Sequence, residues 1–258
     1  MSNLLRNKTI LVAGAGGLFG GVIVKEALEE GAEVFATDIN IVAMKKRLEL
    51  LDVNIQSNLL NLQCLDITDE SSVKSLFRKL DKVLHGAVNA TYPRNKSYGR
   101  HFFDVTLDSF NENLALHLGS AFLFSQQCAA YFKNVNTDFS LVNISSIYGV
   151  IAPKFDVYEN TSMTMPVEYA AIKSALLHLN KYVNAYVCDS KFRINSVSPG
   201  GIFDNQSTQF LEQYKKHTHG KGMLDVKDSV GAVIFLLSDN ARFVTDQNII
   251  VDDGFSIK

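Results

Sequence analysis

Proline and cysteine are scarce in this chain, and long apolar runs are absent. Only four prolines occur among 258 residues, and no Pro/Gly-rich linker, repeat or low-complexity tract divides the sequence. The three cysteines, Cys64, Cys128 and Cys188, are odd in number and far apart. This pattern excludes a disulfide framework, predicts no metal site and favours a reducing, cytoplasmic setting. No apolar run reaches the roughly 20 residues of a membrane-spanning helix, and residues 1–7 are too short and polar for a signal peptide.

A strong excess of one charge is also missing. The formal net charge is -2 and the pI is near 6.3, which favours neither nucleic acid nor an anionic membrane as a partner. Hydrophobic residues make up 47% of the chain and charged residues 20%, as is typical of a globular protein. This length suits one doubly wound domain and is short for two. We therefore expect a single domain over residues 1–258.

The chain does contain a regular alternation of short β-branched segments and longer amphipathic ones. Seven buried strands are predicted at 9–13, 33–37, 60–65, 83–89, 140–144, 192–197 and 248–251. Helices are predicted at 18–30, 41–50, 106–132, 167–187 and 225–237, together with one near Asp69 and a partly helical polar stretch at 204–221. Such alternation predicts an α/β fold, a doubly wound Rossmann seven-stranded parallel sheet flanked by helices. Ligands of these sheets bind at the carboxyl ends of the strands.

A glycine-rich turn, Ala-Gly-Ala-Gly-Gly-Leu-Phe-Gly at 13–20, links the first predicted strand to the first helix. Glycine permits the sharp turn and lets backbone N–H groups approach a pyrophosphate, while the helix N-terminus adds its dipole. A tight turn without a ligand is the alternative, but the position within a βαβ unit favours a dinucleotide. The residues expected to contact it are Gly14, Gly16, Gly17, Leu18 and Phe19.

Asp38 lies at the end of the second predicted strand. A carboxylate at this position accepts hydrogen bonds from the adenosine ribose and repels a 2′-phosphate. No Arg or Lys occurs at 36–43 to bind that phosphate, so NAD is favoured over NADP as the cofactor. A capping role for Asp38 at the next helix is the alternative, and the two roles are compatible.

Tyr169 and Lys173 are four residues apart on the predicted helix 167–187 and therefore share one face. An ammonium beside the phenol is expected to lower the pKa of Tyr169 toward the range of acid–base catalysis, and to hold the nicotinamide ribose. Ser146 follows strand 140–144 and offers a hydroxyl to a substrate carbonyl. Taken singly, these residues are typical of a surface pair and a turn. Together with the glycine turn they predict an oxidoreductase site.

With these motifs the chain resembles the short-chain dehydrogenase/reductase family, in its single-domain branch, over essentially its whole length. The resemblance implies that Tyr169 is the general acid/base, Ser146 the carbonyl partner and Lys173 the ribose-binding cation. Other matching segments add expected cofactor contacts around the adenine, the central strand and the nicotinamide: Ile39, Asp66, Ile67, Asn89, Ala90, Pro199, Gly200 and Ile202.

Some positions depart from the family pattern. Ala13 and Leu18 replace the usual Thr and Gly of the turn, and Thr91 replaces a usual Gly. His117 stands where an asparagine normally completes the proton relay, and it is expected to hold the relay water or to shuttle protons near neutral pH. A histidine packed in a helix or subunit interface is the alternative. If the alignment slips by one turn, Asn113 takes the relay role.

Two segments are expected to form the substrate end of the site. Segment 153–166 lengthens the connection between Ser146 and Tyr169, and its polar residues 158–162 suit the hydroxyls of a sugar-like substrate. Segment 203–222, together with Lys154, offers cations for a phosphate at Lys215, Lys216, His217 and His219. A solvated loop or a subunit contact is the alternative for both segments.

The turn, the insertion and residues 199–206 together resemble the oxidoreductases of bacterial flagellin-modification and nonulosonic-acid pathways. The expected activity is hydride transfer between NAD and a secondary alcohol or ketone of a phosphorylated or nucleotide-linked sugar. A sugar epimerase or dehydratase is one alternative, although those chains continue further beyond Lys173. A catalytically silent NAD-sensing protein is another alternative, because His117 replaces the asparagine that normally completes the proton relay. The resemblance also implies a homo-oligomer, a tetramer or dimer, built through the two long helices and the C-terminal strand.

Overall fold

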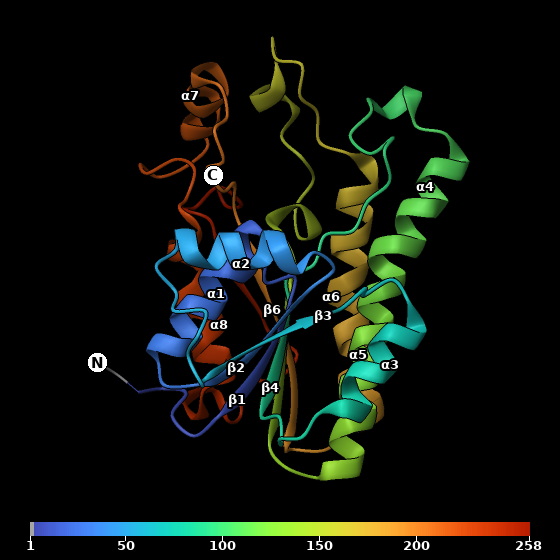
Figure 1. Cartoon of the computed structure of the whole chain (residues 1–258). Coiled ribbons are helices and arrows are strands. Elements are labelled where there is room, and N and C mark those ends of the chain that lie inside the picture. The colour runs from blue at the N-terminus through green and yellow to red at the C-terminus, as the bar shows by residue number, and fades with distance from the viewer. Residues whose placement is uncertain (1–2) are drawn as a thin grey trace.

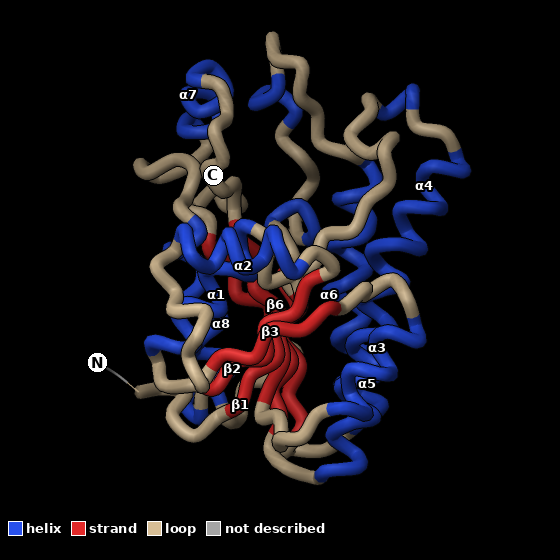
Figure 2. Tube along the Cα trace, viewed as in Figure 1, coloured by secondary structure: helices blue, strands red, loops and turns tan. Residues whose placement is uncertain are grey.

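Seven parallel strands form one central sheet in the computed structural model, which describes residues 3–258 and so leaves the first two residues of segment 1–7 outside (Figures 1 and 2). The strand order is β3-β2-β1-β4-β5-β6-β7. Their bounds are β1 (Thr9–Ala13), β2 (Glu33–Asp38), β3 (Leu60–Cys64), β4 (Gly86–Asn89), β5 (Phe139–Ile144), β6 (Phe192–Pro199) and β7 (Asn248–Val251). The predicted doubly wound α/β fold is thus confirmed.

Helices cover both faces of this sheet. Figure 1 shows α1, α2 and α8 on one side, and α3, α5 and α6 on the other. The helices are α1 (Leu18–Glu29), α2 (Ile41–Leu50), α3 (Glu70–Lys79), α4 (Leu107–Asn113), α5 (Ser120–Val135), α6 (Val167–Val187), α7 (Thr208–Lys216) and α8 (Val226–Leu237). Within residues 3–258, none of them is both long enough and apolar enough to cross a membrane.

Strand alternation divides the core into two layers. In β1, Ile10 and Val12 pack with α1 and α8, whereas Leu11 and Ala13 pack on the opposite face with Phe124 of α5. All five residues are essentially inaccessible to solvent. Successive side chains of a strand point to opposite faces, so a strand buried on both sides must be apolar throughout. This requirement explains the continuous apolar runs in the sequence.

Several element boundaries differ from those expected, and two of the differences have a visible physical cause. The fourth strand begins at Gly86 rather than at residue 83, because the N–H of Leu84 donates to the Tyr131 hydroxyl at 2.9 Å instead of to a neighbouring strand. The long helix continues to Val135 rather than to residue 132. It ends where Asn136 adopts a left-handed conformation, with φ 53°, and donates its N–H to Phe132 O.

The long helix is also irregular near its middle. Residues Leu114–Gly119, between α4 and α5, form a π-helical segment. Such insertions place one extra residue in a turn, change which side chains face a given direction, and frequently occur at functional sites. This one contains His117.

Candidate active site

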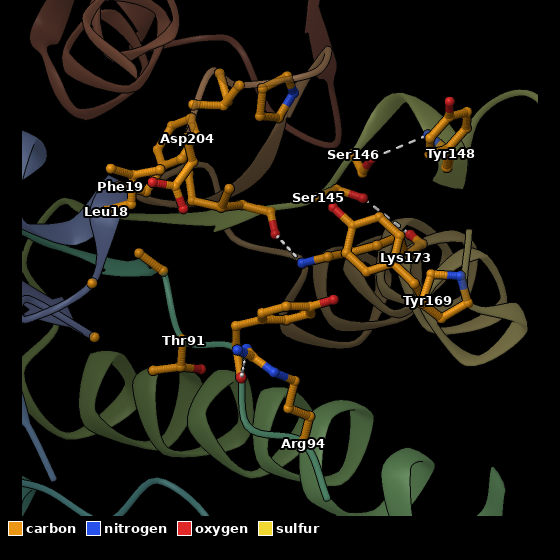
Figure 3. A pocket seen from close by; sticks show the side chains of 18 of the residues that line it. Leu18, Phe19, Thr91, Arg94, Ser145, Ser146, Tyr148, Tyr169, Lys173 and Asp204 are labelled. Carbon is orange, nitrogen blue, oxygen red and sulfur yellow. Dashed lines mark hydrogen bonds between the residues drawn. The ribbon is translucent and has the colours of Figure 1, made fainter. Parts of the chain in front are cut away.

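A cleft of about 950 Å³ runs along the carboxyl ends of the strands, where the sheet order reverses between β1 and β4 (Figure 3). Every residue predicted for the site lines it except Gly16, Asn89 and His117, each of which contacts a lining residue instead. The lining residues from the predicted set are Gly14, Gly17, Leu18, Phe19, Asp38, Ile39, Asp66, Ile67, Ala90, Ser146, Tyr169, Lys173, Pro199, Gly200 and Ile202.

The turn after β1 depends on two of its glycines for its shape. Gly14 has φ +84°, and a Cβ there would lie 2.8 Å from Ala90 O, while a Cβ on Gly20 would overlap Gly14 O. The first turn of α1 has neither a side-chain cap nor an acidic residue. Its unpaired N–H groups and the helix dipole therefore suit the pyrophosphate of a dinucleotide. The bulkier Leu18 leaves its own N–H available for this role.

The Asp38 carboxylate is held at the mouth of this turn. Gly16 N–H donates to Oδ2 at 3.0 Å and Asn40 N–H donates to Oδ1 at 3.0 Å. Asn40, not Asp38, caps α2, because its side chain accepts from Ala43 N–H. Asp38 is therefore braced by two backbone donors and keeps acceptor capacity toward the cleft, as a ribose hydroxyl requires.

Asp66 and Asn89 shape the neighbouring walls by accepting hydrogen bonds within their own turns. Asp66 accepts from Thr68 N–H at 2.9 Å and from its hydroxyl at 2.6 Å. Asn89 is buried and accepts from Thr91 N–H and, at 2.7 Å, from the Thr91 hydroxyl. Thr91 thus satisfies the Asn89 side chain at the position where the family usually has glycine. With the turn and Asp38, these walls fit a dinucleotide laid across the sheet.

Ser146 and Tyr169 meet at the other end of the cleft. The Ser146 Oγ accepts from Tyr148 N–H at 3.2 Å. Burial raises the pKa of Tyr169, and a hydrogen bond with Ser146 lowers it in part. The net direction is opposite to the lowering expected from Lys173, so that expectation was wrong. Burial of the phenol is the largest cause and outweighs the hydrogen bond with Ser146, so the pKa rises.

Lys173 is buried, and its side-chain nitrogen bonds a backbone carbonyl while it lies over the Tyr169 ring. Its Nζ donates to Ile144 O at 2.8 Å and lies 3.5 Å from His117 Nε2, while it is 5.6 Å from the centre of the Tyr169 ring. Burial lowers the pKa of Lys173 to about 7. A lysine that is only partly charged at neutral pH stabilises a phenolate less than a full ammonium does.

The π-helical segment places His117, and not Asn113, beside Lys173. His117 is 3% exposed, and burial, then Lys173 and then Arg94 lower its pKa well below the ordinary value, so the ring is neutral. Asn113 is committed elsewhere: its amide donates to Ser109 O at 3.0 Å and to Glu168 Oε1 at 3.3 Å. The alignment that puts His117 at the relay position therefore matches the geometry.

Sequence reasoning does not single out Tyr92 and Arg94, although both line the cleft. The Tyr92 ring packs edge-on against His117 at 5.1 Å and against Tyr169 at 5.6 Å, and the Arg94 guanidinium lies 4.8 Å above it. Both residues follow the Asn89-Ala90 motif directly, and their position after the end of a strand was the one signal that could have found them.

The two predicted substrate segments meet above the strands, as Figure 1 shows for α7 and the loop before α6. Val157 and Tyr158 pack in one cluster with Phe210 and Tyr214. From residues 158–162 only Tyr158 lines the cleft. The expectation that this whole polar set faces a substrate was wrong, because Thr161 turns back to donate to Tyr158 O and the adjacent Glu159 and Asn160 are exposed.

The cations proposed for a phosphate also lie away from the cleft. Lys154 donates to Phe255 O at 2.9 Å and to Lys258 O at 2.6 Å, and His217 pairs with Asp156 at 2.6 Å. Neither they nor Lys215, Lys216 and His219 line the cleft. These contacts join the C-terminus and the end of α7 to segment 153–166. Lys154 and His217 therefore have a structural role.

Comparison with known proteins places this geometry among oxidoreductases. A family model described as enoyl-(acyl carrier protein) reductase matches residues 15–256. Post-translational flagellin modification protein A of Campylobacter coli is 38% identical, over 98% of this chain and 100% of that protein. The 7alpha-hydroxysteroid dehydrogenase of Bacteroides fragilis is 24% identical, over 99% of this chain and 96% of that protein. A short-chain dehydrogenase from Leptospira borgpetersenii, solved with bound NAD+, superposes with a TM-score of 0.87 at 30% identity, covering 99% of this chain and 95% of that one.

Proposed function

The chain belongs to the short-chain dehydrogenase/reductase family, and we propose that it is an NAD-dependent member acting on a secondary alcohol or ketone of a sugar-like, phosphorylated or nucleotide-linked substrate in surface-glycan or flagellin modification. The observation that carries the proposal is that Ser146, Tyr169 and Lys173 meet in the same cleft as Asp38 and the glycine turn. The likeness to a flagellin modification protein supports the biological setting.

The choice of NAD rests on the adenosine end of the cleft. The Asp38 carboxylate, braced by Gly16 and Asn40, would repel a 2′-phosphate. Among the described residues that line the cleft, Arg94 and Lys173 are the cations, and both belong to the catalytic end. The bound NAD+ of the Leptospira relative supports the same choice.

The chemistry of the chain then follows from the geometry. When bound, the nicotinamide supplies or accepts the hydride. Tyr169 gives its proton to the substrate oxygen in reduction and takes it back in oxidation. Ser146, whose Oγ accepts from Tyr148 N–H, is left with its own hydroxyl proton to donate to that oxygen. Lys173 would hold the ribose. Neutral His117 lies 3.5 Å from its amine and would accept a hydrogen bond from it in the tautomer that carries its hydrogen on Nδ1.

We further propose that residues 1–258 act as one domain in which segments 153–166 and 203–222 enclose the substrate. The aromatic cluster of Tyr158, Phe210 and Tyr214 supports this assignment. We also propose a homodimer or homotetramer, because Tyr182 and Tyr186 of α6 are 66% and 69% exposed. A monomer mass that does not change with concentration would contradict the oligomer.

Tyr169→Phe tests the proposed activity. The variant lacks the proton donor, so kcat is expected to fall about 10²- to 10⁴-fold, while NADH binding stays the same because the turn and Asp38 are untouched. The assay is a panel of sugar phosphates and nucleotide sugars, oxidised with NAD and then with NADP. Wild-type turnover that survives in the variant would exclude Tyr169 as the acid/base.

His117 is tested by comparing His117→Leu with His117→Asn. Leucine removes the acceptor from Lys173, which lowers the Lys173 pKa further and moves the alkaline limb of the kcat–pH profile to lower pH. Asparagine again offers Lys173 an oxygen acceptor. It is therefore expected to return the alkaline limb of the kcat–pH profile to its wild-type position. If the two variants give the same profile as the wild type, His117 only fills space.

A further inference from the structure

The positive charge of Arg94 is not neutralised by any carboxylate within residues 3–258. Among the described residues its guanidinium contacts Tyr92, through one long hydrogen bond from Nη1 to Tyr92 O at 3.4 Å and through Cζ, which lies 4.8 Å above the centre of the Tyr92 ring. Arginine has five N–H donors in a planar fork. Most of them therefore remain available to a ligand of the cleft that Arg94 lines.

This charge lies beside the reacting groups. The Tyr92 ring contacts Arg94 on its face and Tyr169 at its edge, so both residues are one contact away from the same ring. Arg94 also contributes, after burial and Lys173, to the lowered pKa of His117. An anionic group that reached Arg94 would thus lie one aromatic ring away from the substrate oxygen that meets Tyr169.

No other cation among the described lining residues competes for this role. Lys173 is the second cation of the cleft, and its Nζ already contacts Ile144 O and His117, while its remaining donor is the one proposed for the cofactor ribose. Asp204 is an acidic lining residue that belongs to the substrate segment 203–222. Figure 3 shows it on the side of Leu18 and Phe19, with Arg94 on the opposite side.

We propose that Arg94 binds an anionic group of the substrate, a phosphate or a carboxylate, and that it makes the enzyme select anionic over neutral sugar-like substrates. A planar guanidinium pairs with two oxygens of either group at once, which adds both energy and orientation. The contact with the Tyr92 ring favours a position of the guanidinium at the cleft before a ligand binds. The inference deepens the proposed function and rests on it.

The experiment measures binding, so that it does not depend on turnover. Protein saturated with NADH, which fills the pyrophosphate site, is titrated by calorimetry with a neutral hexose, the matching hexose 6-phosphate and the matching hexuronate. The wild type is expected to bind one anionic probe at least about tenfold more tightly than the neutral hexose. Which of the two anions binds distinguishes phosphate from carboxylate.

Arg94→Gln is expected to weaken binding of the preferred anion about 10- to 100-fold, because a charge-assisted pair is lost, and to leave the neutral hexose unchanged. Arg94→Lys keeps the positive charge but lacks the planar guanidinium. Its affinity for the preferred anion should therefore lie between those of the wild type and Arg94→Gln. Lys96→Gln is the matched control, since Lys96 is an exposed cation of the same loop that does not line the cleft.

The proposal is overturned if neither anion binds the wild type more tightly than the neutral hexose, or if Arg94→Gln keeps the preference. It is also overturned if Lys96→Gln lowers the affinity as much as Arg94→Gln, since general surface charge would then explain the effect. Failure of the proposed activity has a different signature, in which no sugar is oxidised by the wild type although the binding preference and its dependence on Arg94 remain.

Discussion

Asp38→Asn is expected to remove the selection of NADH over NADPH. The carboxylate accepts from Gly16 N–H through one oxygen and from Asn40 N–H through the other, both at 3.0 Å. The amide keeps the shape but has only one oxygen, so one of these two donors loses its acceptor. The ribose hydroxyl loses a charged acceptor as well, which costs about 1.5–3 kcal/mol of binding free energy. The affinity for NADH therefore falls about 10- to 150-fold.

The same change favours NADPH. A 2′-phosphate of about two charges, taken at about 5 Å from the carboxylate in a water-like dielectric, is repelled by about 1–2 kcal/mol. Removing the charge removes this repulsion. The difference in binding free energy between the two cofactors therefore narrows by about 2.5–5 kcal/mol, or two to four orders of magnitude in the ratio of Kd values.

The assay is the change in nicotinamide fluorescence on titration with each reduced cofactor, which the absence of tryptophan in the chain simplifies. Asp52→Asn, an exposed carboxylate outside the cleft, is the control for charge alone. Thermal unfolding verifies that the Asp38 variant remains folded. If Asp38→Asn binds NADH as tightly as the wild type does, or if the wild type prefers NADPH, the interpretation of Asp38 is wrong.

Two further predictions concern stability. Burial lowers the Lys173 pKa to about 7 from 10.5, so between these values the unfolded chain binds more protons, and this group makes stability rise with pH. Urea unfolding should show the wild type gaining about 1.4 kcal/mol per pH unit relative to Lys173→Met from about pH 7.5 to 9.5; a constant difference would contradict this. Gly231→Ala meets open space in α8 and should stabilise by about 0.5–1 kcal/mol, whereas Gly20→Ala overlaps Gly14 O and should lower both stability and NADH affinity; equal effects would refute the argument.

Prediction from the sequence succeeded where the residues of a short segment determine its structure by themselves. The buried strands had to be apolar on both faces, and the glycine turn had to join a strand to a helix. Right-handed crossovers then fix which ends of the strands come together. For this reason Asp38, Ser146 and Tyr169 were expected at one edge of the sheet, and the structure brings all three into one cleft.

Prediction failed where the position or the pKa of a group depends on contacts with residues far away in the chain. The start of β4 depends on the Tyr131 hydroxyl, which lies 47 positions beyond Leu84. The pKa of Tyr169 depends on its burial and on the hydrogen bond with Ser146. Two cations expected at the ligand are held elsewhere, His217 by Asp156 of the insertion and His219 through its backbone N–H, which donates to Asp253 O.

The sequence by itself determined the sheet, the dinucleotide turn and the pairing of Tyr169 with Lys173, because periodicity, glycine and helical spacing act over a few residues. Only the tertiary structure decided that His117 rather than Asn113 lies beside Lys173, since one π-helical turn rotates the helix face. Only the tertiary structure placed Arg94 over the Tyr92 ring in the cleft. The first outcome depends on the packing of the π-helical segment against α6, and the second on the packing of the loop after β4 against His117 and Tyr169, which no local pattern encodes.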